Sequence, residues 1–190
     1  MAAPIGAGTT NAASTPIRFE AETVTLGERR IAKLPPEASA ALPSRGQVAV
    51  EGFIDGHPFA DVVEPDGLRG HWVDVDRLLG GTPDATAEGL VSIELAPSST
   101  WPEPEVPDDL RRALDQAPAS AETWADITPM ARWEWVRWIS STRSPSTRER
   151  RVEVGISKLD RGSRRPCCFD LSSCTDPELS KSGKLIRSPA

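Results

Sequence analysis

The hydrophobic pattern of this chain changes its period once, and the change divides the sequence into two parts of different class. Between residues 17 and 96 apolar and polar residues tend to alternate, as in the stretch Ile17–Glu22, and a period of two is typical of β-strands. After the Pro- and Ser-rich segment 97–106 the period becomes helical. The sequence therefore predicts an α+β protein with a β unit first and a helical unit second.

The β unit contains one strong turn signal. Asp55-Gly56 lies between the apolar pairs Phe53-Ile54 and Pro58-Phe59, and a type I′ turn needs two residues that tolerate positive φ. This spacing predicts a β-hairpin. Four further short elements are expected: strands at 68–73 and 90–95, and helices at 36–42 and 76–79. Many short strands joined by Gly and Pro turns indicate a small split β-barrel.

The helical unit is predicted to be a small bundle or hairpin of four helices. Its first helix opens at Pro107, with acidic residues in the first turn, and is expected to end at Pro118. Ser120 is expected to cap a short second helix that runs to Trp124. The last two helices are predicted from Thr128-Pro129 to Ser141, and from Ser144-Pro145, or alternatively Ser146, to Gly162.

The two ends of the chain lack a strong pattern. After Met1, residues 2–16 contain one large apolar side chain, Ile5, and the segment 1–16 is expected to be disordered. From residue 164 we expect an ordered stretch around the cysteines and then a mobile end from residue 181. The predicted division is a tail at 1–16, a barrel at 17–96, a linker at 97–106, helices at 107–163 and a cysteine-containing tail at 164–190.

Charge is segregated along the sequence. The chain carries a formal charge of −6, yet residues 143–165 hold 8 basic and 3 acidic residues. Guanidinium groups bind phosphates and carboxylates in a forked geometry, so Arg148, Arg150 and Arg151 are candidate residues for binding an anionic partner. The same side chains can instead pair with the acidic residues of the barrel, and binding of nucleic acid is a weaker alternative.

Aromatic residues supply a second set of candidates. On a helical wheel, Trp135 and Trp138 lie on the core side of the third helix, whereas Trp133 lies on the polar side, four residues before Arg137. Trp133 is therefore expected to stack on Arg137, to contact a partner, or to pack on a neighbouring element of the same chain. His71 and Trp72, in a predicted strand, are further binding candidates.

The cysteine pattern indicates thiols rather than disulfides or metal ligands. Cys167, Cys168 and Cys174 are an odd number for a disulfide framework, and their spacing differs from that of structural zinc sites. They are candidate redox-active thiols because nearby arginines lower a thiol pKa. We expect no metal and no cofactor.

Short motifs in a fixed order relate the chain to two known domains. The first part resembles the DUF1905 domain through Phe19-x-Ala21, Ile31-x-x-Leu34-Pro35, Val48-x-Val50-x-Gly52-x-Ile54-x-Gly56-x-Pro58-Phe59 and Gly70-His71. The second part resembles the helical domain of the YdeI/OmpD-associated, bacteriocin-protection family through Val106-Pro107-x-Asp109-Leu110-x-x-Ala113-Leu114, Trp138-Ile139, Thr147-Arg148-x-Arg150-Arg151 and the tail Arg164-Arg165-Pro166-Cys167-Cys168-Phe169. The resemblance implies a small barrel followed by helices and a link to tolerance of antimicrobial peptides or stress, but no reaction.

These observations favour a non-catalytic binding or interaction protein with an anionic or protein partner, as a monomer or homodimer. A nucleic-acid-binding protein is the alternative, and a small-molecule enzyme that uses His71 with Asp61 or Asp74 is the second alternative. No run of about 18 apolar residues and no secretion signal are found in the sequence, so a cytoplasmic location without a membrane span is expected.

Overall fold

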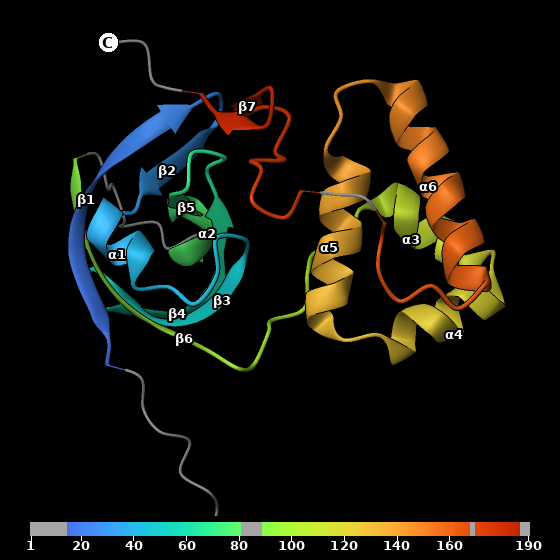
Figure 1. Ribbon diagram of the computed structural model, residues 1–190, viewed down its shortest axis with the longest axis horizontal. Helices are drawn as coiled ribbons and strands as arrows, with labels where there is room; N and C mark the ends of the chain where they lie inside the picture. The colour runs from blue at the N-terminus through green and yellow to red at the C-terminus, as the bar shows by residue number, and fades with distance from the viewer. Residues whose placement is uncertain (1–14, 81–88, 168–169, 187–190) are drawn as a thin grey trace, which may run out of the picture.

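The computed structural model describes residues 15–80, 89–167 and 170–186 (Figure 1). A closed antiparallel barrel of six strands forms its first part and four helices follow, which confirms the predicted α+β class and the order of the two parts. Residues 1–14 of the predicted disordered tail lie outside the described residues.

The barrel has the strand order β1-β2-β5-β4-β3-β6. It closes because the long β1 pairs with β6 along its first half and with β2 along its second half. The predicted small β-barrel is therefore present, and its six strands close on themselves. The strands are β1 (Ile17–Leu26), β2 (Arg29–Lys33), β3 (Val48–Ile54), β4 (His57–Pro65), β5 (His71–Asp74) and β6 (Leu90–Pro97).

The predicted hairpin joins β3 to β4. Asp55 and Gly56 adopt φ values of 48° and 81°, as a type I′ turn requires. Strand β5 begins later than the predicted residue 68, because the Asp66 carboxylate accepts the backbone N–H groups of Leu68 and Gly70 and so holds a turn there. Two short helices, α1 (Pro36–Ala40) and α2 (Val75–Leu78), add buried side chains to the barrel core.

The helical part contains α3 (Asp108–Asp115), α4 (Pro118–Asp126), α5 (Pro129–Ser140) and α6 (Pro145–Asp160) around a core of its own. Thr128 caps α5 and Ser144 caps α6, as predicted, so Ser146 lies within α6. Pro118 does not end the first helix but begins the second, because a residue without an N–H fits the first turn of a helix. Ser120 is consequently inside α4, where its buried hydroxyl donates to the Ile156 carbonyl.

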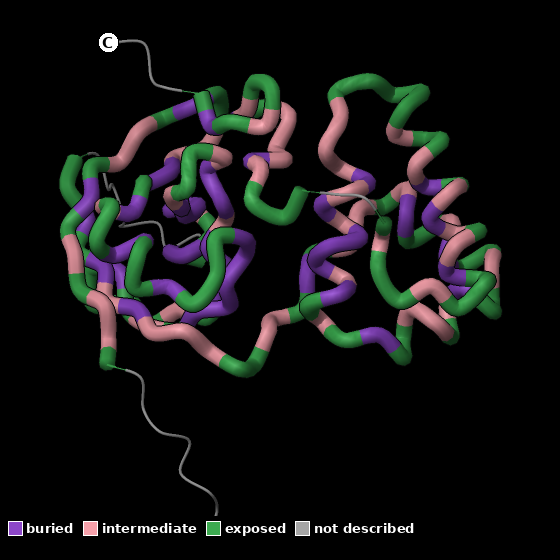
Figure 2. Tube along the Cα trace, viewed as in Figure 1, coloured by how far each residue is buried: buried purple, intermediate pink, exposed green. Residues whose placement is uncertain are grey.

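The C-terminal segment differs most from the prediction. Residues 181–186, expected to be mobile, form a hairpin of β7 (Ser180–Lys181) and β8 (Lys184–Leu185) that packs on the barrel. Leu179 and Leu185 are buried in a cluster with Trp72, and the Leu185 N–H donates to the Asp66 carbonyl at 2.8 Å. Burial of these two leucines favours the ordered state. In Figure 2 the buried residues lie in the barrel and along the facing sides of the helices.

Candidate functional site

The barrel, helix α5 and the C-terminal segment meet around a small cavity of about 140 Å³, here called the junction cavity. Its walls include Trp72 from β5, Trp133 and Arg137 from α5, and Arg29 and Arg77 from the barrel part. Three of the seven predicted binding residues, Trp72, Trp133 and Arg137, are therefore brought together.

Carboxylates of the protein pair with the arginines of the junction cavity. Arg77 Nε donates to Asp61 Oδ2 at 2.6 Å, and Arg137 Nε lies 3.3 Å from Glu64 Oε2. Arg29 donates to Asp176 of the C-terminal segment. Burial raises the pKa of Asp61, and the positive charge of Arg77 opposes that shift. The Arg137–Glu64 pair joins α5 to the barrel, and the Arg29–Asp176 pair joins the C-terminal segment to the barrel.

Trp133 packs on other segments of its own chain, which is one of the three alternatives that the sequence left open. Its ring centroid lies 5.5 Å from the Arg77 guanidinium, and its indole N–H donates to the Pro102 carbonyl at 2.8 Å. Arg137 donates to the Ser173 carbonyl and the Thr175 hydroxyl. Both α5 residues are buried, 8% and 6% exposed, because the side of α5 that the wheel marks as polar faces the barrel and the C-terminal segment.

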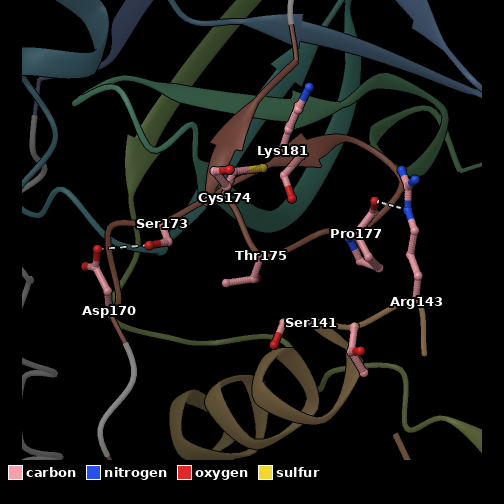
Figure 3. Close-up of a pocket in the computed structure, with 12 residues that line it drawn as sticks. Ser141, Arg143, Asp170, Ser173, Cys174, Thr175, Pro177 and Lys181 are labelled. Carbon is pink, nitrogen blue, oxygen red and sulfur yellow. Dashed lines mark hydrogen bonds between the residues drawn. The ribbon is translucent and has the colours of Figure 1, made fainter. Parts of the chain in front are cut away.

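A larger hollow of about 500 Å³, here called the junction groove, adjoins the cavity (Figure 3). It runs between the end of α5 and the C-terminal hairpin, and shares Cys174, Thr175 and Pro177 with the junction cavity. Six of its twelve lining residues are serines or threonines, which carry hydroxyl groups. The lining residues are Ser141, Thr142, Arg143, Asp170, Ser173, Cys174, Thr175, Pro177, Ser180, Lys181, Ser182 and Gly183.

The charged groups of the junction groove are two cations and one carboxylate. Arg143 is exposed, and its Nε donates to the Pro177 carbonyl at 2.5 Å, which fixes the guanidinium beside the groove. Lys181 is exposed and forms no ion pair within the described part of the chain. Hydrogen bonds from the hydroxyls of Ser172 and Ser173 lower the pKa of Asp170 and satisfy its charge. The groove therefore offers hydroxyl groups and positive charge to a ligand.

Comparison with known proteins assigns both parts of the fold. Residues 19–95 match the family model DUF1905, a domain of unknown function, and residues 103–162 match the model OmdA, described as bacteriocin-protection, YdeI or OmpD-associated. These two matched regions are here called the DUF1905 domain and the OmdA domain. The predicted resemblance is confirmed. A search of curated proteins found no match to the chain.

One wall of the junction groove lies within a region that a family model matches, and the other wall does not. Ser141, Thr142 and Arg143 belong to the OmdA domain, whereas the wall formed by residues 170–183 lies beyond the residues that either family model matches. Within the described ranges, no helix is both long and apolar enough to cross a membrane.

The predicted arginine face of the OmdA domain lies mainly against its own helices. Arg148 donates to Asp109 through Nε at 2.6 Å and Nη2 at 2.9 Å, and these bonds lower the pKa of Asp109. Arg151 donates to the Trp138 carbonyl and the Ser141 hydroxyl. Arg150 is exposed and forms no hydrogen bond or ion pair within the described segments. Two of the three arginines therefore stabilise the helical domain itself.

His71 of the DUF1905 domain is wholly buried. Its Nδ1 lies 2.6 Å from the Ser39 hydroxyl and its Nε2 lies 3.0 Å from the Gly46 carbonyl, so a neutral ring protonated at Nε2 satisfies both contacts. Burial lowers the pKa of His71. The pairing of His71 with Asp61 or Asp74, considered from the sequence, is not formed: Asp61 binds Arg77, and Asp74 caps α2.

The cysteines occupy different environments. Cys174 lines both the junction cavity and the junction groove, and burial raises its pKa to about 11, so the thiol is protonated at neutral pH. Cys167 is exposed, with its Sγ 2.7 Å from Lys158 Nζ, whereas Cys168 lies outside the described residues. Among the described residues, no group of three or more His, Cys, Asp and Glu side chains is arranged to hold a metal ion.

The charged residues of the junction that sequence reasoning missed include Arg29, Glu64, Arg77 and Lys181. The first three lie in the acidic barrel part, where no local pattern separates a charged residue facing α5 from one facing solvent. For Lys181, a signal was available in Ser182-Gly183, a dipeptide typical of turns, with the apolar residues Leu179 and Leu185 on its two sides.

Proposed function

We propose that the chain is a non-catalytic cytosolic binding protein that holds an anionic ligand in the junction groove. The observation that carries this proposal is the pair of exposed cations, Arg143 and Lys181, on a hydroxyl-lined groove of a protein whose formal charge is −6. A volume of about 500 Å³ falls within the range of about 300–1,000 Å³ that is common for ligand pockets.

The chemistry of the groove supports binding rather than group transfer. Its one thiol, Cys174, has a raised pKa, and its carboxylate, Asp170, already accepts two hydroxyl hydrogen bonds. Arg143 already donates from Nε and Nη2 to the Pro177 and Glu178 carbonyls, and its remaining N–H groups can donate to a carboxylate or a phosphate. The hydroxyls of the groove that do not donate to a protein group in the described residues can donate to further ligand oxygens; they belong to Thr142, Thr175, Ser180 and Ser182. The family description of the OmdA domain supports a role for this binding in protection against bacteriocins or related stress.

The proposal is tested by thermal-shift and calorimetric titration of the full chain. The probes are inorganic phosphate, succinate and the dipeptide Asp-Glu, which separate phosphate from carboxylate recognition. The test variant is Arg143→Gln/Lys181→Gln. Its matched control is Arg150→Gln/Lys184→Gln, which removes the same charge from exposed positions that do not line the groove.

We expect at least one probe to raise the Tm of the natural chain, because a ligand that binds only the folded state stabilises it. The groove variant should lose at least about tenfold in affinity, since a hydrogen bond to a charged group contributes roughly 1.5–3 kcal/mol. The control should stay within about twofold of the natural chain. The proposal fails if all three probes leave the Tm unchanged, or if the control loses as much affinity as the groove variant.

A further inference from the structure

The OmdA domain has a second hollow, on the surface formed by α3, α4 and α6, here called the helical groove. Its volume is about 540 Å³. Ala113 and Ala117 lie on one side, and Val152 and Ile156 of α6 lie on the other. All four side chains are apolar, and three of them are only partly buried, so the groove leaves apolar surface in contact with water.

The rim of the helical groove is acidic. Glu153 and Asp160 of α6 are exposed, lie seven residues apart and line the hollow, with no Lys or Arg among its described lining residues. Seven residues correspond to two helical turns, about 10.5 Å along the helix axis. Neither carboxylate forms a hydrogen bond or an ion pair with any residue that the structure describes.

This arrangement is the opposite of that at the junction. There, Glu64, Asp61 and Asp176 each have an arginine partner supplied by the protein. The described lining of the helical groove offers apolar surface and negative charge but contains no cation. A partner surface that complements the helical groove is therefore apolar and flanked by positive charges.

We propose that the helical groove binds a cationic amphipathic helix of a partner peptide. Apolar side chains at spacings of three and four residues would pack on Val152 and Ile156, and a lysine on each side of this strip would approach Glu153 or Asp160. Amphipathic helices bind grooves between helices in this way, with apolar anchors on one face and charges on the flank. The inference does not depend on anion binding at the junction, which involves other residues.

The test uses the full chain and two synthetic 14-residue peptides. One has leucine on one helical face and lysine on the other, and the second has glutamate in place of every lysine. Binding is followed by fluorescence anisotropy of the labelled peptides at low and high salt. The test variant is Glu153→Lys/Asp160→Lys. The matched control, Glu28→Lys/Glu37→Lys, makes the same change of charge at exposed positions of the barrel part.

We expect the lysine peptide to bind the natural chain and the control equally well, and the charge-reversed variant at least tenfold more weakly. The glutamate peptide should bind at least tenfold more weakly than the lysine peptide. Equal binding of the two peptides, equal losses in the two variants, or no binding of the lysine peptide would each overturn the proposal. Circular dichroism of the variants verifies that the exposed substitutions leave the fold intact.

Discussion

The OmdA helices present charge in two contrasting settings. On the side that faces the barrel, Arg137 is buried and pairs with Glu64. On the outer side, Glu153 and Asp160 are exposed and have no partner within the described residues. A charge that leaves water must be paired, whereas an exposed charge needs no partner in its own chain. The buried Arg137 is therefore engaged within the junction, whereas the exposed Glu153 and Asp160 are available to a ligand.

The sharpest test of this comparison removes one charge from each side. Arg137→Leu leaves Glu64 in the junction without its partner, so the free energy of unfolding should fall by about 3–5 kcal/mol. Glu153→Leu removes an exposed, unpaired carboxylate and should change stability by no more than about 0.5 kcal/mol. Urea denaturation followed by tryptophan fluorescence measures both. Similar losses in the two variants would contradict the contrast between the two sides.

The next largest loss in the free energy of unfolding is expected from a substitution in the C-terminal segment. Leu179 is wholly buried against the barrel, so Leu179→Ala should cost about 2–5 kcal/mol through lost burial and a cavity. Leu171→Ala in the same segment is the control, because that side chain is 42% exposed and should contribute within about 0.5 kcal/mol. The measurement is again the urea midpoint. If Leu179→Ala were as stable as the control, the segment would not be held on the barrel as described.

The smallest expected loss of stability follows from breaking the ion pair of Asp109 and Arg148. This pairing lowers the pKa of folded Asp109, so its stabilisation is complete above the unfolded pKa of about 3.9 and disappears as the pH falls through the lower folded value. Because both side chains are partly exposed, Arg148→Gln should cost about 0.2–1 kcal/mol at pH 7.

The pH dependence supplies the control for this pair. The difference in unfolding free energy between Arg148→Gln and the natural chain should shrink as the pH is lowered below about 4. Arg150→Gln, at an exposed arginine, should show almost no difference at any pH. A deficit in Arg148→Gln that grows toward low pH would have the wrong sign for this account.

Local signals in the sequence were enough for much of the fold. The Asp55-Gly56 turn and the Thr128 and Ser144 caps depend on backbone geometry and on neighbours within a few residues, so a short stretch of sequence specifies them. Pro118 was misread because the same residue fits both the end of one helix and the start of the next.

The candidate site was less predictable, because its geometry comes from contacts between distant segments. Trp133 stacks on Arg77, which lies 56 residues earlier in the chain and in the barrel part. A helical wheel separates apolar from polar positions, but it cannot tell a polar side that faces solvent from one that faces arginines and carboxylates of another domain. The arginines of α6 illustrate the converse: their clustering is visible in the sequence, but Arg148 and Arg151 bind partners within the OmdA domain.

The central claim, that the junction groove is a ligand site, is tested most directly by mapping bound anions on ¹⁵N-labelled protein. Amide shifts are recorded while the three anionic probes are titrated into the natural chain and into Arg143→Gln/Lys181→Gln. The account predicts saturable shifts confined to residues 141–143 and 173–183, and their loss in the variant. Shifts centred on Arg150 of α6, or shifts that persist unchanged in the variant, would contradict it.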